Sequence, residues 1–150
     1  DLLKLMGIRV ANDLIHENHV NQEQNLWRHV ILHAFEDARL TSTDRISSLN
    51  KLDANAWINA SKDFNQICWW AGWDHDEVRI RYRKDLNNLD IQFNVKHIKW
   101  REYYVLYNEL KLEADKDKRR ELRKVVEKKR RDVFDCQSIV MTTFFITVKA

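Results

Sequence analysis

The stretch that decides the fold runs from Ser61 to Arg83 and reads SKDFNQICWWAGWDHDEVRIRYR. Ser61 is a preferred residue type at a helix N-cap, and the apolar residues after it recur at helical spacing. Gly72 gives the backbone the freedom to reverse, and Asp74 can cap a second helix. The stretch therefore predicts two short helices joined by a tight turn around Gly72.

This layout is that of a helix-turn-helix, in which the turn holds the second helix where it can enter a DNA major groove. The pattern wants a small residue before the turn glycine and a β-branched residue after it, and Cys68, Gly72 and Val78 fill these positions. Asp76 and Glu77 put negative charge at the start of the second helix, the one that would enter DNA, although carboxylates also suit a helix N-terminus. The alternative is a helical hairpin that serves only as core or as a protein interface.

The surrounding sequence resembles a group of small phage and bacterial DNA-binding proteins over residues 26–83. The segments that carry the resemblance are Leu26-Trp27-Arg28, Val30-Ile31, Ala34, Asp37-Ala38, Ala56-Trp57-Ile58 and Asp63-Phe64 up to Ala71-Gly72. The resemblance implies a helical protein that binds double-stranded DNA.

Composition bounds the class of protein. The chain has 150 residues, no proline and only two glycines, which favours a single all-α domain with long helices. A net charge of +3 means that any nucleic-acid signal must come from local clustering of basic residues. Two cysteines give no disulfide framework and favour a reducing, cytoplasmic location, nucleoid-associated if the source is bacterial. No run of 18 apolar residues exists, so no membrane partner is predicted.

The chain is predicted to divide into three parts. Residues 1–94 form a helical domain with helices over 2–18, 22–39 and 45–60, followed by the helix-turn-helix at 61–84. Residues 95–134 form one long helical extension, and 135–150 form a tail. Part of the tail, residues 138–148, prefers a strand but has no evident pairing partner.

The second half of the predicted extension is strongly basic. Residues 116–132 carry ten basic and four acidic side chains, with a thin apolar seam that includes Leu122 and Val125. Such a helix can project into water, pair with another helix, or lie along an anionic surface. The seam makes a homo-oligomer possible without requiring one.

Catalytic and metal-binding patterns are weak. His29 and His33 have the i, i+4 spacing of a zinc pair, but a site would need further ligands such as His16 or His19. The acidic residues around Asp74 are better explained as helix caps. We therefore expect a non-enzyme without a metal or cofactor.

The preferred function is DNA binding by a regulator of transcription, with contacts of two kinds. The residues expected to hold phosphates are Lys62, Lys84, Arg119, Arg120 and Arg123. The residues expected to reach base edges are His75, Arg79 and Arg83. The alternatives are a protein-interaction factor that uses the tryptophan-rich face and a phage DNA-packaging or virion component. Trp69, Trp70 and Trp73 are otherwise expected in the core against the helix at 22–39.

Overall fold

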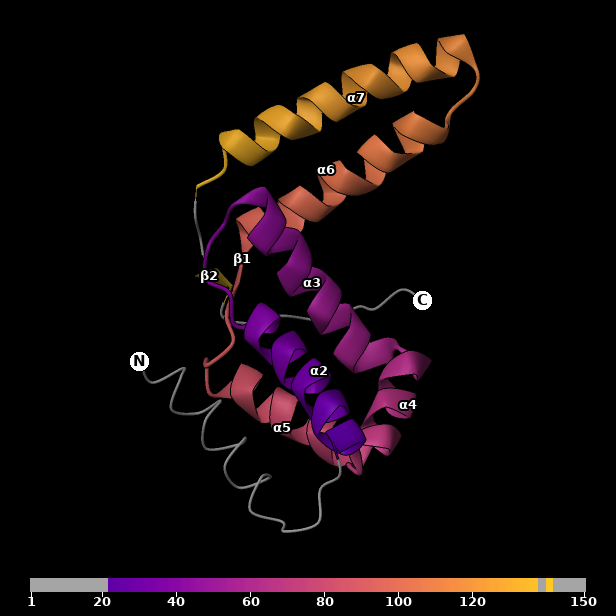
Figure 1. Ribbon diagram of the computed structural model, residues 1–150. Helices are drawn as coiled ribbons and strands as arrows, with labels where there is room; N and C mark the ends of the chain where they lie inside the picture. The colour runs from indigo at the N-terminus through magenta and orange to yellow at the C-terminus, as the bar shows by residue number, and fades with distance from the viewer. Residues whose placement is uncertain (1–21, 138–139, 142–150) are drawn as a thin grey trace. The chain divides into compact units, whose positions relative to one another are not determined.

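The computed structural model describes residues 22–137 and 140–141, and its regular structure is almost entirely helical (Figure 1). The predicted all-α class is confirmed. The helices are α2 (Gln22–Ala38), α3 (Arg45–Ala60), α4 (Lys62–Ala71), α5 (His75–Asn87), α6 (Val95–Leu112) and α7 (Lys116–Phe134). The predicted helix over 2–18, His16, His19 and most of the 138–148 segment lie outside the described residues.

The described residues fall into two compact units. The first comprises residues 22–39 and 54–91, with α2, the end of α3, α4 and α5. The second comprises residues 40–53, 92–137 and 140–141, with the start of α3, α6 and α7. These units divide the chain differently from the predicted segments, because residues 40–53 group with the later helices.

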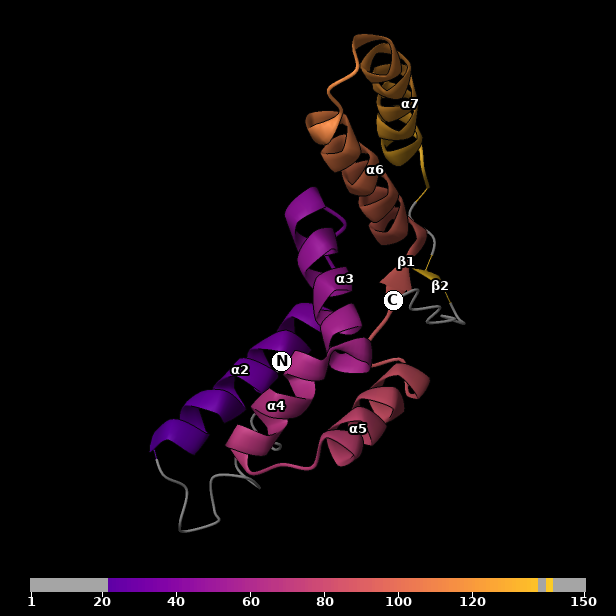
Figure 2. The same cartoon turned by 90° about the vertical axis from the view of Figure 1, so that its right-hand side faces the viewer.

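The core of the first unit lies where α2 packs against α4 and where α5 meets α3 (Figures 1 and 2). Phe64 is fully buried and meets the ring of Trp57 edge-on, with 5.1 Å between ring centroids. The buried Tyr82 hydroxyl donates to Asn55 Oδ1 at 2.7 Å, which ties α5 to α3. Cys68 is also fully buried, as its place in the apolar pattern predicts.

Apolar residues recur at helical spacing along α2 and predict a continuous buried stripe, but only some of them are buried. Ile31 and Ala38 are buried, but Leu26 and Val30 are exposed. Arg28 is buried instead, and its Nε donates to Ala71 O at 2.9 Å. This bond explains a charged residue in the core, because it satisfies a carbonyl at the C-terminal end of α4.

The second unit contains a helical hairpin rather than the predicted single long helix. The chain leaves the helix at Glu113, and Asp115 begins α7 by accepting hydrogen bonds from the backbone N–H groups of Asp117 and Lys118. α6 and α7 then lie side by side in opposite directions (Figures 1 and 2). The predicted continuity of residues 95–134 is therefore wrong, since an N-cap can start a new helix without proline or glycine.

This unit also contains a short antiparallel pair of β-strands, each two residues long. β1 (Phe93–Asn94) pairs with β2 (Val140–Met141), with Phe93 opposite Met141. The strand preference of the tail thus has a partner, which lies just before α6. The sequence did not reveal it because two residues are too few to show a strand period.

Three side chains hold the backbone of residues 40–43 in the second unit. Lys51 Nζ donates to Leu40 O at 2.8 Å, His97 Nε2 donates to Ser42 O at 3.0 Å, and Trp100 Nε1 donates to Thr43 O at 3.0 Å. His97 also accepts from Asn94 N through Nδ1 as half of a capping box. The ring is therefore neutral, because one nitrogen must donate while the other accepts.

Candidate nucleic-acid interface

The two predicted helices and the tight turn between them are confirmed. Ser61 caps α4 by accepting from Asp63 N, and Asp74 caps α5 by accepting from Asp76 N and Glu77 N. Gly72 has φ +72° and its N–H bonds to Trp69 O, while Trp73 N bonds to Cys68 O. This is the left-handed helix ending that favours glycine. The geometry shows two capped helices and a tight turn between them.

Arg79, predicted to project from α5 toward base edges, is instead built into the first unit. Its side chain is only 12% exposed, and Nε donates to Ile58 O at 2.9 Å. One terminal nitrogen donates to Asn65 Oδ1 at 2.6 Å, and the guanidinium lies 5.0 Å from the ring centre of Phe64. The prediction of an outward Arg79 is wrong, because these partners come from α3 and α4.

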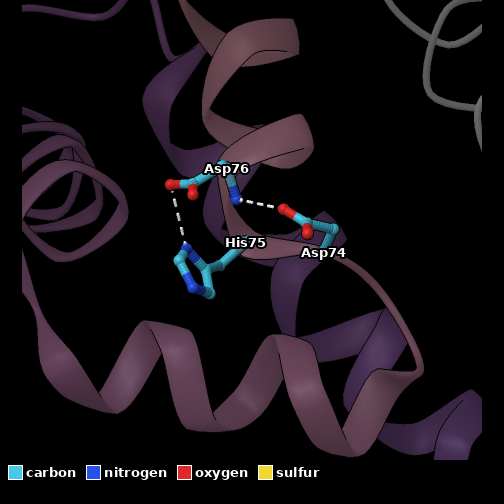
Figure 3. A group of neighbouring side chains, drawn as sticks. All are labelled: Asp74, His75 and Asp76. Carbon is cyan, nitrogen blue, oxygen red and sulfur yellow. Dashed lines mark hydrogen bonds and ion pairs between the residues drawn. The ribbon is translucent and has the colours of Figure 1, made fainter.

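His75 lies beside Asp74 and Asp76 at the start of α5 (Figure 3). Its Nδ1 is 3.1 Å from Asp76 Oδ1 and also 3.1 Å from a terminal nitrogen of Arg79. One ring nitrogen cannot donate to the first and accept from the second at the same time, so only one of the two contacts is a hydrogen bond in either tautomer. Asp74 is already occupied as an N-cap, and its bonds to backbone N–H groups lower its pKa. Capping accounts for Asp74, as predicted, whereas the side chain of Asp76 contacts His75 and Arg79.

The other predicted DNA-binding residues of the first unit are accessible. Lys62, Arg83 and Lys84 are all exposed, and within the described residues no carboxylate lies within ion-pair distance of them. Arg81 is exposed as well, and sequence reasoning did not single it out. Asp76 and Glu77 are exposed on the same helix, so α5 presents both signs of charge.

The basic residues of α7 divide into paired and unpaired groups. Lys124 meets Glu121, Lys129 meets Glu102 of α6, and Arg130 lies 3.9 Å from Glu127. The predicted phosphate-binding residues Arg119, Arg120 and Arg123 are exposed and, in the described part of the chain, have no acidic side chain within ion-pair distance. Their positive charge is therefore available to an anion outside the unit.

The thin apolar seam of α7 is covered by α6. Val126 and Val133 are buried and Leu122 is partly buried, whereas Val125 is 44% exposed. Phe134 meets the ring of Trp100 with 5.8 Å between ring centroids, and Lys99 Nζ reaches Asp132 O. The pairing partner that the sequence left open is a helix of the same chain.

The tryptophans follow the core prediction only in part. Trp70 contacts Trp27 of α2 at 4.8 Å between ring centroids, and Trp73 lies under the guanidinium of Arg28. Trp69 is 73% exposed, so the expectation that it packs in the core is wrong, and Trp70 remains 40% exposed despite its contact with α2. Helical periodicity explains the difference, because Trp69 and Trp70 are adjacent and cannot both face α2.

Within the part of the chain that the structure describes, the histidine pair of α2 gathers no further metal ligands. His29 Nδ1 lies 2.7 Å from Asn25 O, and His33 lies near Glu36 and Asp37 on an exposed surface. Among the described residues, the only His, Cys, Asp or Glu group close enough to hold an ion is the one at the start of α5.

Comparisons with protein-family models, with curated protein sequences and with solved structures found no match to this chain. None of the helices in the described part combines the length and the apolarity that crossing a bilayer requires.

Proposed function

We propose that this chain binds double-stranded DNA through its phosphates, with α7 as the principal contact. The observation that carries the proposal is the exposed set of Arg119, Arg120 and Arg123, which has no ion-pair partner among the described residues, on a helix with ten basic and four acidic residues. Guanidinium groups suit phosphate because they present several donors in a fixed plane. Each neutralised phosphate releases condensed counterions, which gives affinity that depends on salt.

The helix-turn-helix makes a weaker contact in this proposal. Arg79 is committed to the fold, and the carboxylates of Asp76 and Glu77 would repel phosphates near the start of α5. His75, Lys62, Arg83 and Lys84 remain as secondary candidates. Sequence-specific reading and a role in regulating transcription therefore stay predictions that rest on the resemblance and the helix layout.

The test is duplex binding by the full chain over a series of salt concentrations. Replacing Arg119, Arg120 and Arg123 with Gln should weaken binding to all duplexes alike. The slope of log affinity against log salt should fall by about 0.9 for each phosphate that is no longer neutralised. The matched control is Glu121→Gln with Lys124→Gln, which removes one charge of each sign from α7. An unchanged slope in the triple variant would remove α7 from the interface.

A second candidate is a protein-interaction factor, favoured by the exposure of Trp69. A large aromatic side chain at the surface is a frequent centre of protein interfaces. This candidate moves ahead if the wild-type chain shows no salt-dependent DNA binding.

A further inference from the structure

The outward face of α5 carries charges of both signs around an exposed apolar side chain. Its centre is Ile80, an apolar side chain that is 62% exposed. Asp76 and Glu77 lie four and three residues before it, and Arg83 and Lys84 lie three and four residues after it. Residues three or four apart in a helix lie on the same face, so these five form one continuous surface.

The charges on this face are reversed about its centre. The acidic end carries two carboxylates, the basic end carries two cations, and all four side chains are exposed. The inward neighbours Val78 and Tyr82 are buried and hold the helix in this orientation. We propose that this face docks a second copy of this chain, with the two α5 helices antiparallel across a two-fold axis at Ile80.

Symmetry makes the pairing specific. In an isologous contact both subunits use the same surface. The residue on the two-fold axis therefore meets its own copy, so Ile80 packs against Ile80 of the partner subunit. Ideal helical geometry then places Arg83 beside the partner's Asp76 and Lys84 beside the partner's Glu77. A parallel arrangement would instead set like charges against each other, which costs energy. The face is thus complementary to itself in one direction only.

The existing interactions of the face leave it open. Asp76 lies near His75 and Arg79, yet its side chain remains 73% exposed and keeps capacity for a further cation. Glu77, Arg83 and Lys84 have no ion-pair partner among the described residues. The proposal does not depend on DNA binding, and a dimer through this face would keep it from entering a groove.

The first test measures the mass of the full chain in solution from low to high micromolar concentration. The mass should rise from that of one chain, 18.2 kDa, toward that of two. Ile80→Asp should keep the chain monomeric throughout. Ile46→Asp is the matched control, because Ile46 is similarly exposed on α3 and lies off this face. A wild-type chain that stays monomeric, or a dimer that survives Ile80→Asp, would overturn the proposal.

The second test separates charge pairing from simple apolar contact. Arg83→Glu with Lys84→Glu makes the face wholly acidic, and Asp76→Lys with Glu77→Lys makes it basic. Each variant alone should be monomeric, and an equimolar mixture should recover the dimer. Circular dichroism of each variant checks its fold. A mixture of folded variants that stays monomeric rejects the antiparallel pairing, and if the basic variant does not fold, the Ile80→Asp comparison decides alone.

Discussion

A single arginine changes what α5 can do. Arginine is a residue type that often contacts DNA, and on a helical projection Arg79 lies apart from the buried Val78. Its guanidinium nevertheless donates to Ile58 O and Asn65 Oδ1. Helical periodicity did not reveal these contacts, because it identifies only the apolar face of a helix. A long side chain on another face can still reach the ends of neighbouring helices. The caps at Ser61 and Asp74 were predictable, because each depends only on residues nearby in the sequence.

We expect Arg79→Ala to lower the free energy of unfolding by about 2–3 kcal/mol, since it leaves a carbonyl and an amide oxygen without their charged donor. Arg83→Ala serves as the control on the same helix and should stay within about 0.5 kcal/mol of wild type. Urea unfolding followed by circular dichroism measures both. Equal stability of the two variants would contradict the structural role of Arg79.

Gly72 provides a second prediction at this scale. Its positive φ disfavours a β-branched residue, and a Cβ placed there would come within 3.2 Å of Gln24 Nε2. We expect Gly72→Val to cost about 1–3 kcal/mol, and Gly72→Asn to cost less because asparagine tolerates the left-handed region. Thermal melting compares the two. If Val and Asn behave alike, backbone conformation is not what the glycine supplies.

At the scale of elements, the sequence predicts the helices of the α6–α7 hairpin but not the break between them. Helical content and the basic run were evident, but the break at residues 113–115 contains neither proline nor glycine. Only the polar cap Asp115 marks it, and such residues also occur within helices. The seam was visible, yet the identity of its partner depends on the chain folding back, which local patterns do not encode.

Two adjacent valines test this packing. Val126 is 4% exposed against 44% for Val125, so they differ in burial and not in type. We expect Val126→Ala to cost about 1–3 kcal/mol, from reduced apolar burial and a residual cavity. Val125→Ala should change stability by less than about 0.5 kcal/mol. Denaturant unfolding gives both values, and a reversed order would mean that α7 turns a different side toward α6.

At the scale of the whole molecule, the candidate DNA-binding residues are divided between the two units. The two capped helices α4 and α5 belong to the first unit, whereas α7 belongs to the second, with Arg119, Arg120 and Arg123 lacking an ion-pair partner among the described residues. The grouping of residues 40–53 with α6 and α7 was not predictable, because it depends on side chains some fifty residues away, such as His97 bonding to Ser42. Truncation after Leu112 is a poor probe of DNA binding, since it would also strip α6 of its packing partner.

Overall stability should depend on pH through His97. Burial lowers its pKa below the ordinary value of 6.5, so in acid the unfolded chain takes up a proton that the folded chain does not. The stabilisation is complete above about pH 6.5 and is lost as pH falls through the lower folded pKa. The facing charged groups are Lys51, which lowers the pKa of His97, and Asp44, which raises it.

Urea unfolding at neutral and mildly acidic pH measures this loss. Hydrogen bonds from Ser42 and Ser47 hold the pKa of Asp44 well below its usual range, so that carboxyl stays ionised over the interval. His97→Gln cannot titrate, and its stability should change less between the two pH values than that of wild type. A wild-type decline no steeper than that of His97→Gln would rule out the histidine as the source.

The burial of Cys68 determines which of the two cysteines can be labelled chemically. Burial raises the pKa of the Cys68 thiol to about 12, and only the thiolate reacts readily with electrophiles. The other cysteine, Cys136, is partly exposed and follows the C-terminal end of α7. A maleimide dye should therefore attach at Cys136 first and place a fluorescent reporter beside the basic helix without any engineered substitution.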